Sequence, residues 1–236
     1  MTEAEDLAAA RRTILEQIAT AAARVGRDPA SVQVVAVTKT VPPERILAAA
    51  AAGFRTFGEN RVQERQAKAD ATAAATATWH LIGPLQSNKA RRAVELFDVI
   101  ETVDSVELAE RLSRIAAELR PGDRLPILLQ VNVDDDATKA GFEPAALSRD
   151  LGAILDLPGI SVGGLMTVGR LVDSPERARP TFVALRTLSE RLRALHPGLG
   201  PALSMGMSED YPIAVEEGAT LVRIGRAIFG ARPTVR

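Results

Sequence analysis

The sequence predicts an α/β fold, a single (β/α)8 or TIM barrel with one extra helix at its N-terminal end. Short, nearly continuous apolar runs alternate with longer amphipathic patterns about eight times in 236 residues, as buried parallel strands alternate with helices. Eight such units in roughly 250 residues are typical of this barrel. The alternative, an open doubly wound sheet, is disfavoured because no Gly-x-Gly-x-x-Gly pattern follows the first apolar run.

The extra helix and the strands come from periodicity. A helix is predicted over residues 3–25, because Leu7, Ile14 and Ile18 recur at helical spacing and Gly26 follows. The apolar runs predict eight strands, over 32–39, 54–60, 79–85, 98–104, 126–134, 159–168, 202–207 and 219–225.

Helical patterns fill the intervals between these strands. They cover 42–53, 61–70, 86–97, 105–119, 144–155, 174–195 and 208–218, and residues 226–232 close the chain. Ser87 or Asn88 is expected to cap the third of these helices and Ser208 the last, because hydroxyl and amide side chains accept from the first free N–H groups of a helix.

Composition narrows the class of protein. The net charge of -1 gives no reason to expect nucleic acid or an anionic membrane as a partner. There is no cysteine and there are two histidines, so we expect neither a disulfide nor a metal centre. No apolar run reaches the roughly 18 residues of a membrane span, and no signal peptide opens the chain. We therefore expect one cytoplasmic domain over residues 1–236, since no linker divides it.

Polar and small residues gather where the predicted strands end. In this barrel the chemistry lies at the carboxyl ends of the strands. Lys39 follows the first strand there, and an amine in a partly desolvated pocket has a lowered pKa and can form a Schiff base with a carbonyl. Ser208 and Gly225-Arg226 end the last two units, where this fold commonly binds phosphate. An amine beside a phosphate cradle indicates a phosphorylated aldehyde, either pyridoxal phosphate or a sugar phosphate.

Ordinary structural roles compete with these interpretations. Lys39 fits a surface lysine whose stem lies on apolar neighbours, and Arg223 fits a barrel-interior arginine paired with a carboxylate. His80 suits a core or rim position better than that of a base. Asn60 favours a turn at its strand end, and Met166 is a natural packing residue.

Several strings resemble one known family. VAVTKT, FGEN-x-VQE, WHLIGPLQSNK, QVN, GLMT, LSMGMS and VRIG-x-AIFG occur in this order from about Val34 to Ala231. They resemble the YggS/PROSC family of pyridoxal phosphate homeostasis proteins, which is similar in fold to the N-terminal barrel of alanine racemase. The resemblance implies pyridoxal 5'-phosphate as a covalent aldimine at Lys39.

The resemblance also assigns the other site residues. Arg223 would contact the pyridine nitrogen, Ser208, Gly225 and Arg226 would surround the phosphate, and Asn60 and Met166 would line the ring pocket. We place His80 in the same cofactor-binding set. One residue departs from the pattern, because relatives often carry Ser or Thr where Arg226 stands, so the phosphate loses a hydroxyl contact there.

The predicted function is a carrier of pyridoxal phosphate rather than an enzyme. A carboxylate at the pyridine nitrogen strengthens the cofactor as an electron sink, whereas an arginine disfavours a proton on that nitrogen. The alternative, a small amino-acid racemase, needs a second base opposite Lys39, and the single tyrosine, Tyr211, is badly placed for it. A Schiff-base aldolase is a third hypothesis. We expect a monomer that hands the cofactor to apo-enzymes.

Overall fold

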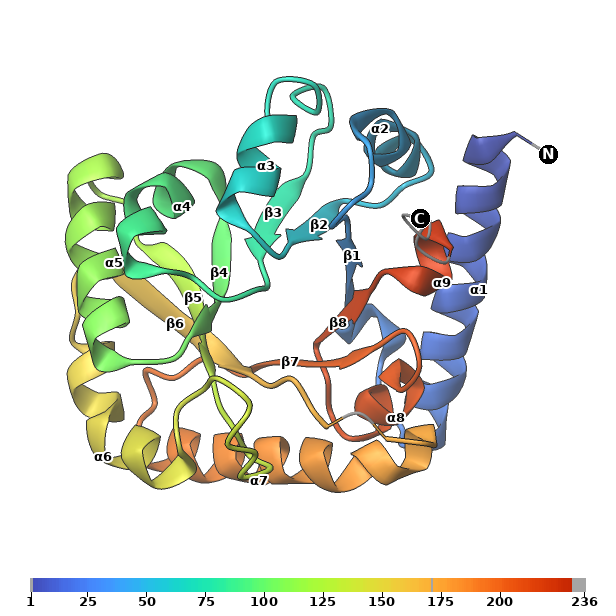
Figure 1. Ribbon diagram of the computed structural model, residues 1–236. Helices are drawn as coiled ribbons and strands as arrows, with labels where there is room; N and C mark the ends of the chain where they lie inside the picture. Colours follow the sequence, from blue (N-terminus) through green and yellow to red (C-terminus); the bar gives the residue numbers. More distant parts are fainter. Residues whose placement is uncertain (1, 171, 231–236) are drawn as a thin grey trace.

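The computed structural model describes residues 2–170 and 172–230, and it confirms the barrel (Figure 1). Eight strands close in the order β1-β2-β3-β4-β5-β6-β7-β8, and every neighbouring pair is parallel. The carboxyl ends of all strands therefore lie at one end of the barrel. The strands are β1 Gln33–Val37, β2 Thr56–Glu59, β3 Thr78–Leu81, β4 Val99–Val103, β5 Leu125–Gln130, β6 Ile160–Met166, β7 Ala202–Met207 and β8 Leu221–Ile224.

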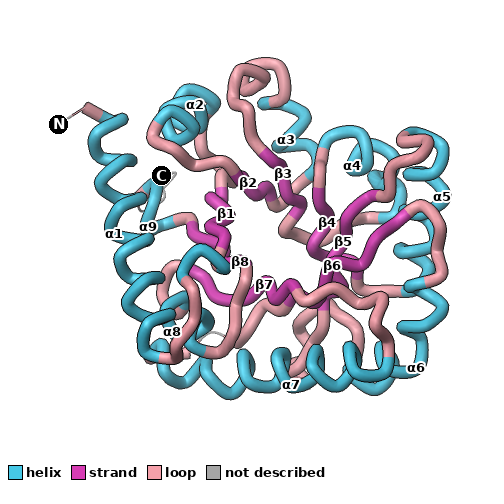
Figure 2. The backbone as a smooth tube through the Cα atoms, turned by 180° about the vertical axis from the view of Figure 1, so that it is seen from behind, coloured by secondary structure: helices cyan, strands magenta, loops and turns pink. Residues whose placement is uncertain are grey.

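The helices surround this barrel, as both views of the backbone show (Figures 1 and 2). The α-helices are α1 Glu3–Arg24, α2 Pro43–Ala51, α3 Val62–Lys68, α4 Ala90–Leu96, α5 Val106–Leu119, α6 Pro144–Leu155, α7 Arg179–Leu195, α8 Tyr211–Glu216 and α9 Arg226–Phe229. Short 3-10 turns add η1 Pro29–Ser31, η2 Ser87–Lys89 and η3 Pro175–Ala178.

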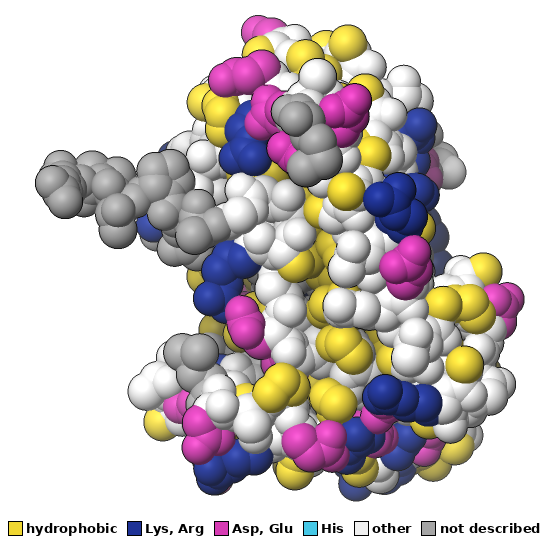
Figure 3. All heavy atoms as spheres, turned by 90° about the vertical axis from the view of Figure 1, so that its right-hand side faces the viewer, with side chains coloured by type: hydrophobic (Ala, Val, Ile, Leu, Met, Phe, Trp, Pro, Cys, Tyr) yellow, Lys and Arg dark blue, Asp and Glu magenta, His cyan; other side chains and the backbone are white. Residues whose placement is uncertain are grey.

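The predicted extra helix is α1. Thr2 and Glu5 form a reciprocal capping box at its start, and Leu7, Ile14 and Ile18 are buried on its inner face. The helix packs beside α2, α8 and α9. Figure 3 shows its outer face, with hydrophobic side chains along the middle and charged side chains to either side. Helix α1 thus covers the barrel where the first and last strands meet.

The barrel interior has an apolar part and a polar part. Val35, Val37, Ile82, Leu128, Met166 and Leu221 form an apolar cluster separate from the main core between strands and helices. Gly58 leaves room for it, because a Cβ there would lie 2.9 Å from atoms of both Val35 and Ile82. Four polar side chains, His80, Glu101, Ser204 and Arg223, are also buried inside. Met166, which the resemblance assigns to the ring pocket, lies within this apolar cluster.

Three predicted helix starts are wrong in detail. Ser87 begins η2 rather than capping α4, and no side chain caps either element. The helix expected over 174–195 opens as η3, because Pro180 has no N–H to give to the carbonyl four residues earlier. Ser208 does not cap α8, whose N-cap residue is Asp210. No helix in residues 2–170 and 172–230 combines the length and apolar character needed to cross a membrane.

Candidate functional site

The candidate site is a cavity of about 580 Å³ at the carboxyl ends of the strands. Its walls come from the ends of β1, β7 and β8 and from the loop after β6. The described residues that line it are Val37, Lys39, Gly169, Arg170, Val172, Asp173, Ser174, Pro175, Met207, Ser208, Glu209, Asp210, Arg223, Gly225 and Arg226. Five of the eight residues predicted from the sequence line it, and Asn60, His80 and Met166 do not.

Lys39 stands on a tight turn directly after β1. The Thr38 N–H donates to the Gly58 carbonyl at 2.9 Å, and the Val41 N–H donates back to the Thr38 carbonyl at 2.9 Å. Thr40 has a φ of 64°, a left-handed conformation that strains a β-branched residue. Lys39 is half-buried and lies between the main cavity and a smaller one of about 250 Å³. The turn thus holds the lysine in the cavity wall, not on the open surface.

Ser208 and the start of α9 form a small polar cradle in the same cavity. The Ser208 hydroxyl accepts from the Gly225 N–H at 3.3 Å and more weakly from the Ala227 N–H at 3.5 Å. Gly206, two residues earlier, has a φ of 87°, and a Cβ there would lie 2.5 Å from the Ala214 Cβ. Ser208, after β7, thus lies against the start of α9, after β8, and two N–H groups of that segment converge on its hydroxyl oxygen. Such a cradle suits an anion.

The Arg226 side chain does not point into this cradle as a hydroxyl would. Its guanidinium forms an ion pair with Glu209 at 2.9 Å, and the two side chains are 65% and 68% exposed. The pair lies across the rim, between the loops after β7 and β8. A pair this exposed is worth little energy. Arg226 is thus a rim residue whose side chain lies outside the cradle.

Arg223 lies on β8 below the cavity, and its guanidinium is fixed from two sides. One nitrogen donates to the Ser204 hydroxyl at 2.6 Å, and the other donates to the Thr167 carbonyl at 2.7 Å. The Ser204 hydroxyl donates in turn to Glu101 at 2.5 Å. Glu101 also contacts the Nδ1 atom of His80 at 2.5 Å. A buried chain of polar groups therefore runs across the barrel from His80 to Arg223.

The charges in this chain balance one another. Burial raises the pKa of Glu101, but the hydrogen bond and charge of His80, the charge of Arg223 and the bond from Ser204 outweigh it, so the net shift is downward. Burial lowers the pKa of Arg223, and the charges of Glu101 and Asp210 oppose this. An arginine stays protonated even so. The interior thus holds an ionised carboxylate as the counterion of a permanent cation.

Three predicted residues do not line the cavity. His80 is buried below it in the chain to Arg223, which agrees with a core role. Met166 lies in the apolar interior cluster. Asn60 follows β2 at the same end of the barrel, and its carbonyl oxygen would lie 2.3 Å from a Cβ at Gly83. The structure therefore brings Lys39, Ser208, Arg223, Gly225 and Arg226 together and leaves these three around them.

The sequence reasoning missed two groups of residues. Glu101 and Ser204 hold Arg223, and their signal was a polar residue within an apolar strand, as in VIETV. Glu59 and Lys68 form an ion pair beside the Lys39 turn. The sequence signals for them were the charged residue in FGEN and the lysine in the helical pattern that follows. Residues 169–170 and 172–175, after β6, also line the cavity, although nothing in their sequence marked them.

Tyr211 lies away from the cavity. Its ring is buried, and its hydroxyl contacts the Gln17 side-chain oxygen of α1 at 2.5 Å. Burial raises the pKa of this phenol. The single tyrosine of the chain is thus engaged with the extra helix rather than directed at Lys39.

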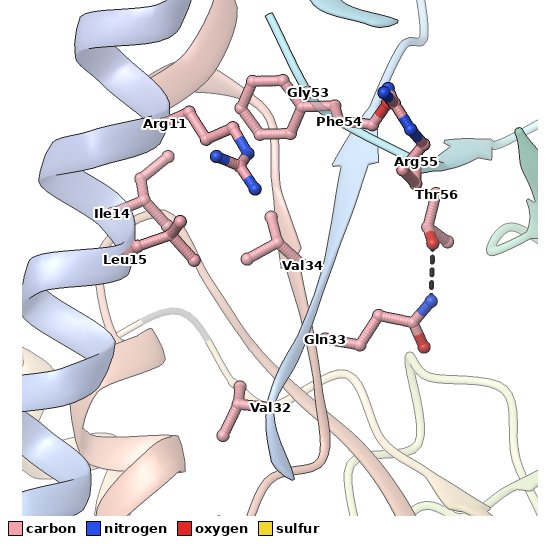
Figure 4. Close-up of a pocket in the computed structure, with 10 residues that line it drawn as sticks. All are labelled: Arg11, Ile14, Leu15, Val32, Gln33, Val34, Gly53, Phe54, Arg55 and Thr56. Atoms are coloured by element: carbon pink, nitrogen blue, oxygen red, sulfur yellow. Dashed lines mark hydrogen bonds between the residues drawn. The ribbon is translucent and has the colours of Figure 1, made fainter. Parts of the chain in front are cut away.

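A different cavity, of about 230 Å³, lies near the start of β1 and β2 (Figure 4). Arg11, Ile14 and Leu15 reach it from α1, and Gln33 donates to Thr56 across the two strands at 2.5 Å. It is at the amino ends of the strands, where barrels of this class do not place their chemistry. The Lys39 cavity is therefore the better candidate for the functional site. No cluster of three or more metal-ligating side chains occurs among the described residues.

Comparisons with known proteins show the family to which the barrel is similar. The family model described as alanine racemase, N-terminal domain, matches residues 10–233. The pyridoxal phosphate homeostasis protein of Pseudomonas aeruginosa is 44% identical in an alignment of 229 positions that covers 93% of this chain and 96% of that protein. The one of Escherichia coli K12 is 40% identical and covers 96% of this chain and 97% of its own length.

Solved structures add a fold comparison. The structure of PipY from Synechococcus elongatus PCC7942 with PLP bound has a TM-score of 0.81 and 46% identity, over 92% of this chain and 100% of that one. An alanine racemase of Clostridium difficile 630 has a TM-score of 0.71 at 15% identity, over 94% of this chain and 60% of that one. The second likeness concerns the fold alone, and it places the match within part of a longer enzyme.

Proposed function

We propose that this chain, which belongs to the family of pyridoxal phosphate homeostasis proteins, binds pyridoxal 5'-phosphate (PLP) reversibly at Lys39 and holds it without efficient catalysis. The observation that carries the proposal is the convergence of an amine, an amide cradle and a buried arginine on one cavity. The PLP-bound relative PipY supports the choice of ligand.

The residues present fit this cofactor. PLP has an aldehyde, a phosphate and a ring nitrogen, and the cavity offers one group suited to each. The half-buried Lys39 provides an amine, and Ser208 with the Gly225 N–H provides anion donors. Arg223 provides a fixed cation below them. The volume of about 580 Å³ lies within the usual range of small-molecule sites, roughly 300–1,000 Å³.

We assign one role to each side chain. Lys39 would form a reversible Schiff base with the aldehyde carbon, whose oxygen would leave as water. The Ser208 hydroxyl and the N–H groups of Gly225 and Ala227, which share the Ser208 oxygen in this structure, would donate to the phosphate. Arg223 would face the ring nitrogen. Asn60, His80 and Met166 support the pocket from around and below it rather than contacting the phosphate.

The same residues argue against efficient catalysis. When bound, PLP supplies an electron sink whose strength depends on a protonated ring nitrogen. Arg223 keeps its charge, because Ser204 and Glu101 hold and balance it, and a fixed cation disfavours a second proton beside it. A racemase also needs a base opposite Lys39, and the hydroxyl of Tyr211 contacts Gln17 instead. These contacts favour a carrier over an enzyme.

Further details belong to the same proposal. We propose that residues 1–236 act as one barrel domain in the cytoplasm, as a monomer, and that the bound PLP passes to apo-enzymes that need it. The open rim of the cavity supports transfer, since Met207, Glu209 and Arg226 are exposed beside the cradle.

Absorbance tests the assignment. Purified protein mixed with PLP should show the visible band of a lysine Schiff base, and Lys39→Ala should abolish it. Lys89→Ala is the matched control, because Lys89 is outside the cavity lining and should leave the band unchanged. Reduction with borohydride followed by peptide mass analysis should place the label on Lys39. A band that survives in Lys39→Ala would refute this attachment site.

The alternative function is a small PLP-dependent amino-acid racemase. Its support is the presence of Lys39, one candidate base, on a barrel similar to that of alanine racemase. Chiral analysis of amino acids incubated with PLP-loaded protein separates the two functions. Turnover at roughly 1 per second or faster would favour the racemase, whereas the carrier predicts far slower turnover at most.

A further inference from the structure

A buried charged cluster lies against the turn that carries Lys39. We call it the Glu59 cluster, and it consists of Thr38, Glu59, Glu64 and Lys68. Glu59 is the last residue of β2, and Lys68 is the last residue of α3, with Glu64 one helical turn before it. Thr38 and Glu59 are fully buried, and the Lys68 side chain is 13% exposed. None of the four lines the PLP cavity.

Lys68 joins this cluster to the backbone of the Lys39 turn. Its ammonium donates to Glu59 Oε1 at 2.8 Å and to the carbonyl oxygen of Thr38 at 2.8 Å. The Thr38 hydroxyl donates to the same Glu59 oxygen at 2.7 Å. The Thr38 carbonyl thus accepts from two donors, Lys68 and the Val41 N–H. Thr38 is the residue directly before Lys39, so these bonds fix the base of the lysine side chain.

The cluster is built from groups that are costly to bury alone. Burial raises the pKa of Glu59, the bonds and charge of Lys68 and the bond from Thr38 lower it, and contact with Glu64 raises it again, so that the net shift is upward. The second oxygens of Glu59 and Glu64 are buried and have no hydrogen-bond partner among the described residues. Two carboxylates in contact repel each other when both are ionised. The ammonium of Lys68, bonded to Glu59, opposes this repulsion.

We propose that Lys68 is a positioning residue for Lys39, acting through the Thr38 carbonyl and the Glu59 carboxylate. The inference rests on the proposed function, in which Lys39 bonds to PLP. The turn includes the left-handed Thr40, a conformation that persists only where surrounding contacts enforce it. Lys68 supplies one such contact and places a fixed positive charge one residue from Lys39. It therefore sets both the direction and the proton affinity of the Lys39 nitrogen.

The test uses Lys68→Met, which keeps most of the aliphatic stem and removes the charge and both hydrogen bonds. PLP titrations followed by absorbance should show on the order of tenfold weaker Schiff-base formation, as misplaced reactive groups do. The pH midpoint of the absorbance change should rise, because removing a cation and unmasking Glu59 both favour a proton on the Lys39 nitrogen. Lys68→Arg retains a charge and donors, and it should recover part of both effects.

Arg120→Met is the matched control. Arg120 also donates to a backbone carbonyl, that of Phe97, at 2.6 Å, but it lines a different cavity, near Trp79 and Asp98. We expect it to lower the melting temperature without moving the pH midpoint. A Lys68→Met protein that is less stable but binds PLP with the wild-type affinity and midpoint would overturn the inference, and it would assign Lys68 to folding alone.

A second variant covers the case in which Lys68→Met does not fold. Glu59→Gln keeps an oxygen acceptor for Thr38 and Lys68 but removes the negative charge, so the midpoint should fall instead of rise. An unchanged midpoint in Glu59→Gln would equally overturn the inference. Failure of the proposed function has a different signature, because wild-type protein itself would then give no Schiff-base band.

Discussion

Replacing Glu101 by glutamine would remove the charge at the centre of the barrel while keeping the size of the side chain. In the structure, one Glu101 oxygen contacts His80 at 2.5 Å and the other accepts from Ser204 at 2.5 Å. Ser204 also accepts from Arg223. In the Glu101→Gln protein the buried Arg223 cation would therefore lack its main counterion. If the new amide NH2 faced Ser204, it would meet a hydroxyl that donates to residue 101 in the wild-type protein.

The magnitude follows from burial. Glu101 is 0% exposed and Arg223 is 4% exposed. Removing one partner of a buried ion pair lowers the free energy of unfolding by about 3–5 kcal/mol. The charge of Asp210 also acts on Arg223, which places the expected loss toward the lower end. For a chain of this size each kcal/mol moves the melting temperature by about 2–4 °C. We therefore expect a decrease of roughly 6–12 °C for a loss of about 3 kcal/mol.

The assay is urea unfolding followed by circular dichroism, with Glu118→Gln as the control. Glu118 pairs with Arg91 on the surface, where the two side chains are 60% and 50% exposed, and its replacement should change the free energy of unfolding far less than that of Glu101. The pKa of Glu101 is lowered in the folded protein. Its stabilisation is thus fully present above the unfolded carboxyl pKa, about 4.3, and is lost as the pH falls through the lower folded pKa.

The difference between wild type and Glu101→Gln should accordingly be constant near neutral pH and shrink in acid. A Glu101→Gln protein within about 1 kcal/mol of wild type at pH 7 would refute the reasoning. It would mean that the carboxylate contributes no more to the free energy of unfolding than an exposed one.

Two further predictions concern the cradle. Gly206→Ala should destabilise the fold by about 1–3 kcal/mol from overpacking, beyond the cost of its left-handed backbone, because the new Cβ would lie 2.5 Å from Ala214. The control is Gly122→Ala, which has a φ of 83° and open space around it and therefore measures the backbone cost alone. Equal melting temperatures for the two variants would contradict the predicted clash. Arg226→Ser removes the exposed pair with Glu209 and should change the free energy of unfolding by less than about 1 kcal/mol. In a PLP titration this variant should bind at least as tightly as the wild-type protein, because a serine hydroxyl can reach the phosphate. Clearly weaker binding would show that the Arg226 guanidinium contacts the ligand.

The predicted barrel is confirmed because its signals are local. A continuous apolar run such as Val34 to Val37 indicates a strand that is buried on both faces. The amphipathic pattern of α5 indicates a helix that is buried on one face. Element ends were predicted less well. Serine is a common helix N-cap residue, yet the Ser208 hydroxyl accepts hydrogen bonds from the N–H groups of residues 17 and 19 positions later in the chain. A local pattern holds no information about a donor supplied by another loop.

Some residues of the candidate site could be predicted from the sequence and others could not. Lys39, Ser208 and Gly225 were predictable, because a parallel barrel brings every strand end to one rim whatever the details of packing. Glu101 and Ser204, which hold Arg223, were not predictable. Glu101 lies on β4, three strands before the β7 that carries Ser204, and only closure of the barrel brings them within hydrogen-bonding distance.

The amino-acid sequence was thus enough to predict the barrel and to place Lys39 at the carboxyl end of its first strand, because periodicity and strand order are properties of the chain. The tertiary structure alone decided that Arg223 has a buried counterion, that Arg226 pairs with Glu209 and that Tyr211 is held by α1. These facts depend on the direction of a side chain across a closed barrel or between loops. Burial and the available partners set that direction, and neither is defined until the chain has packed.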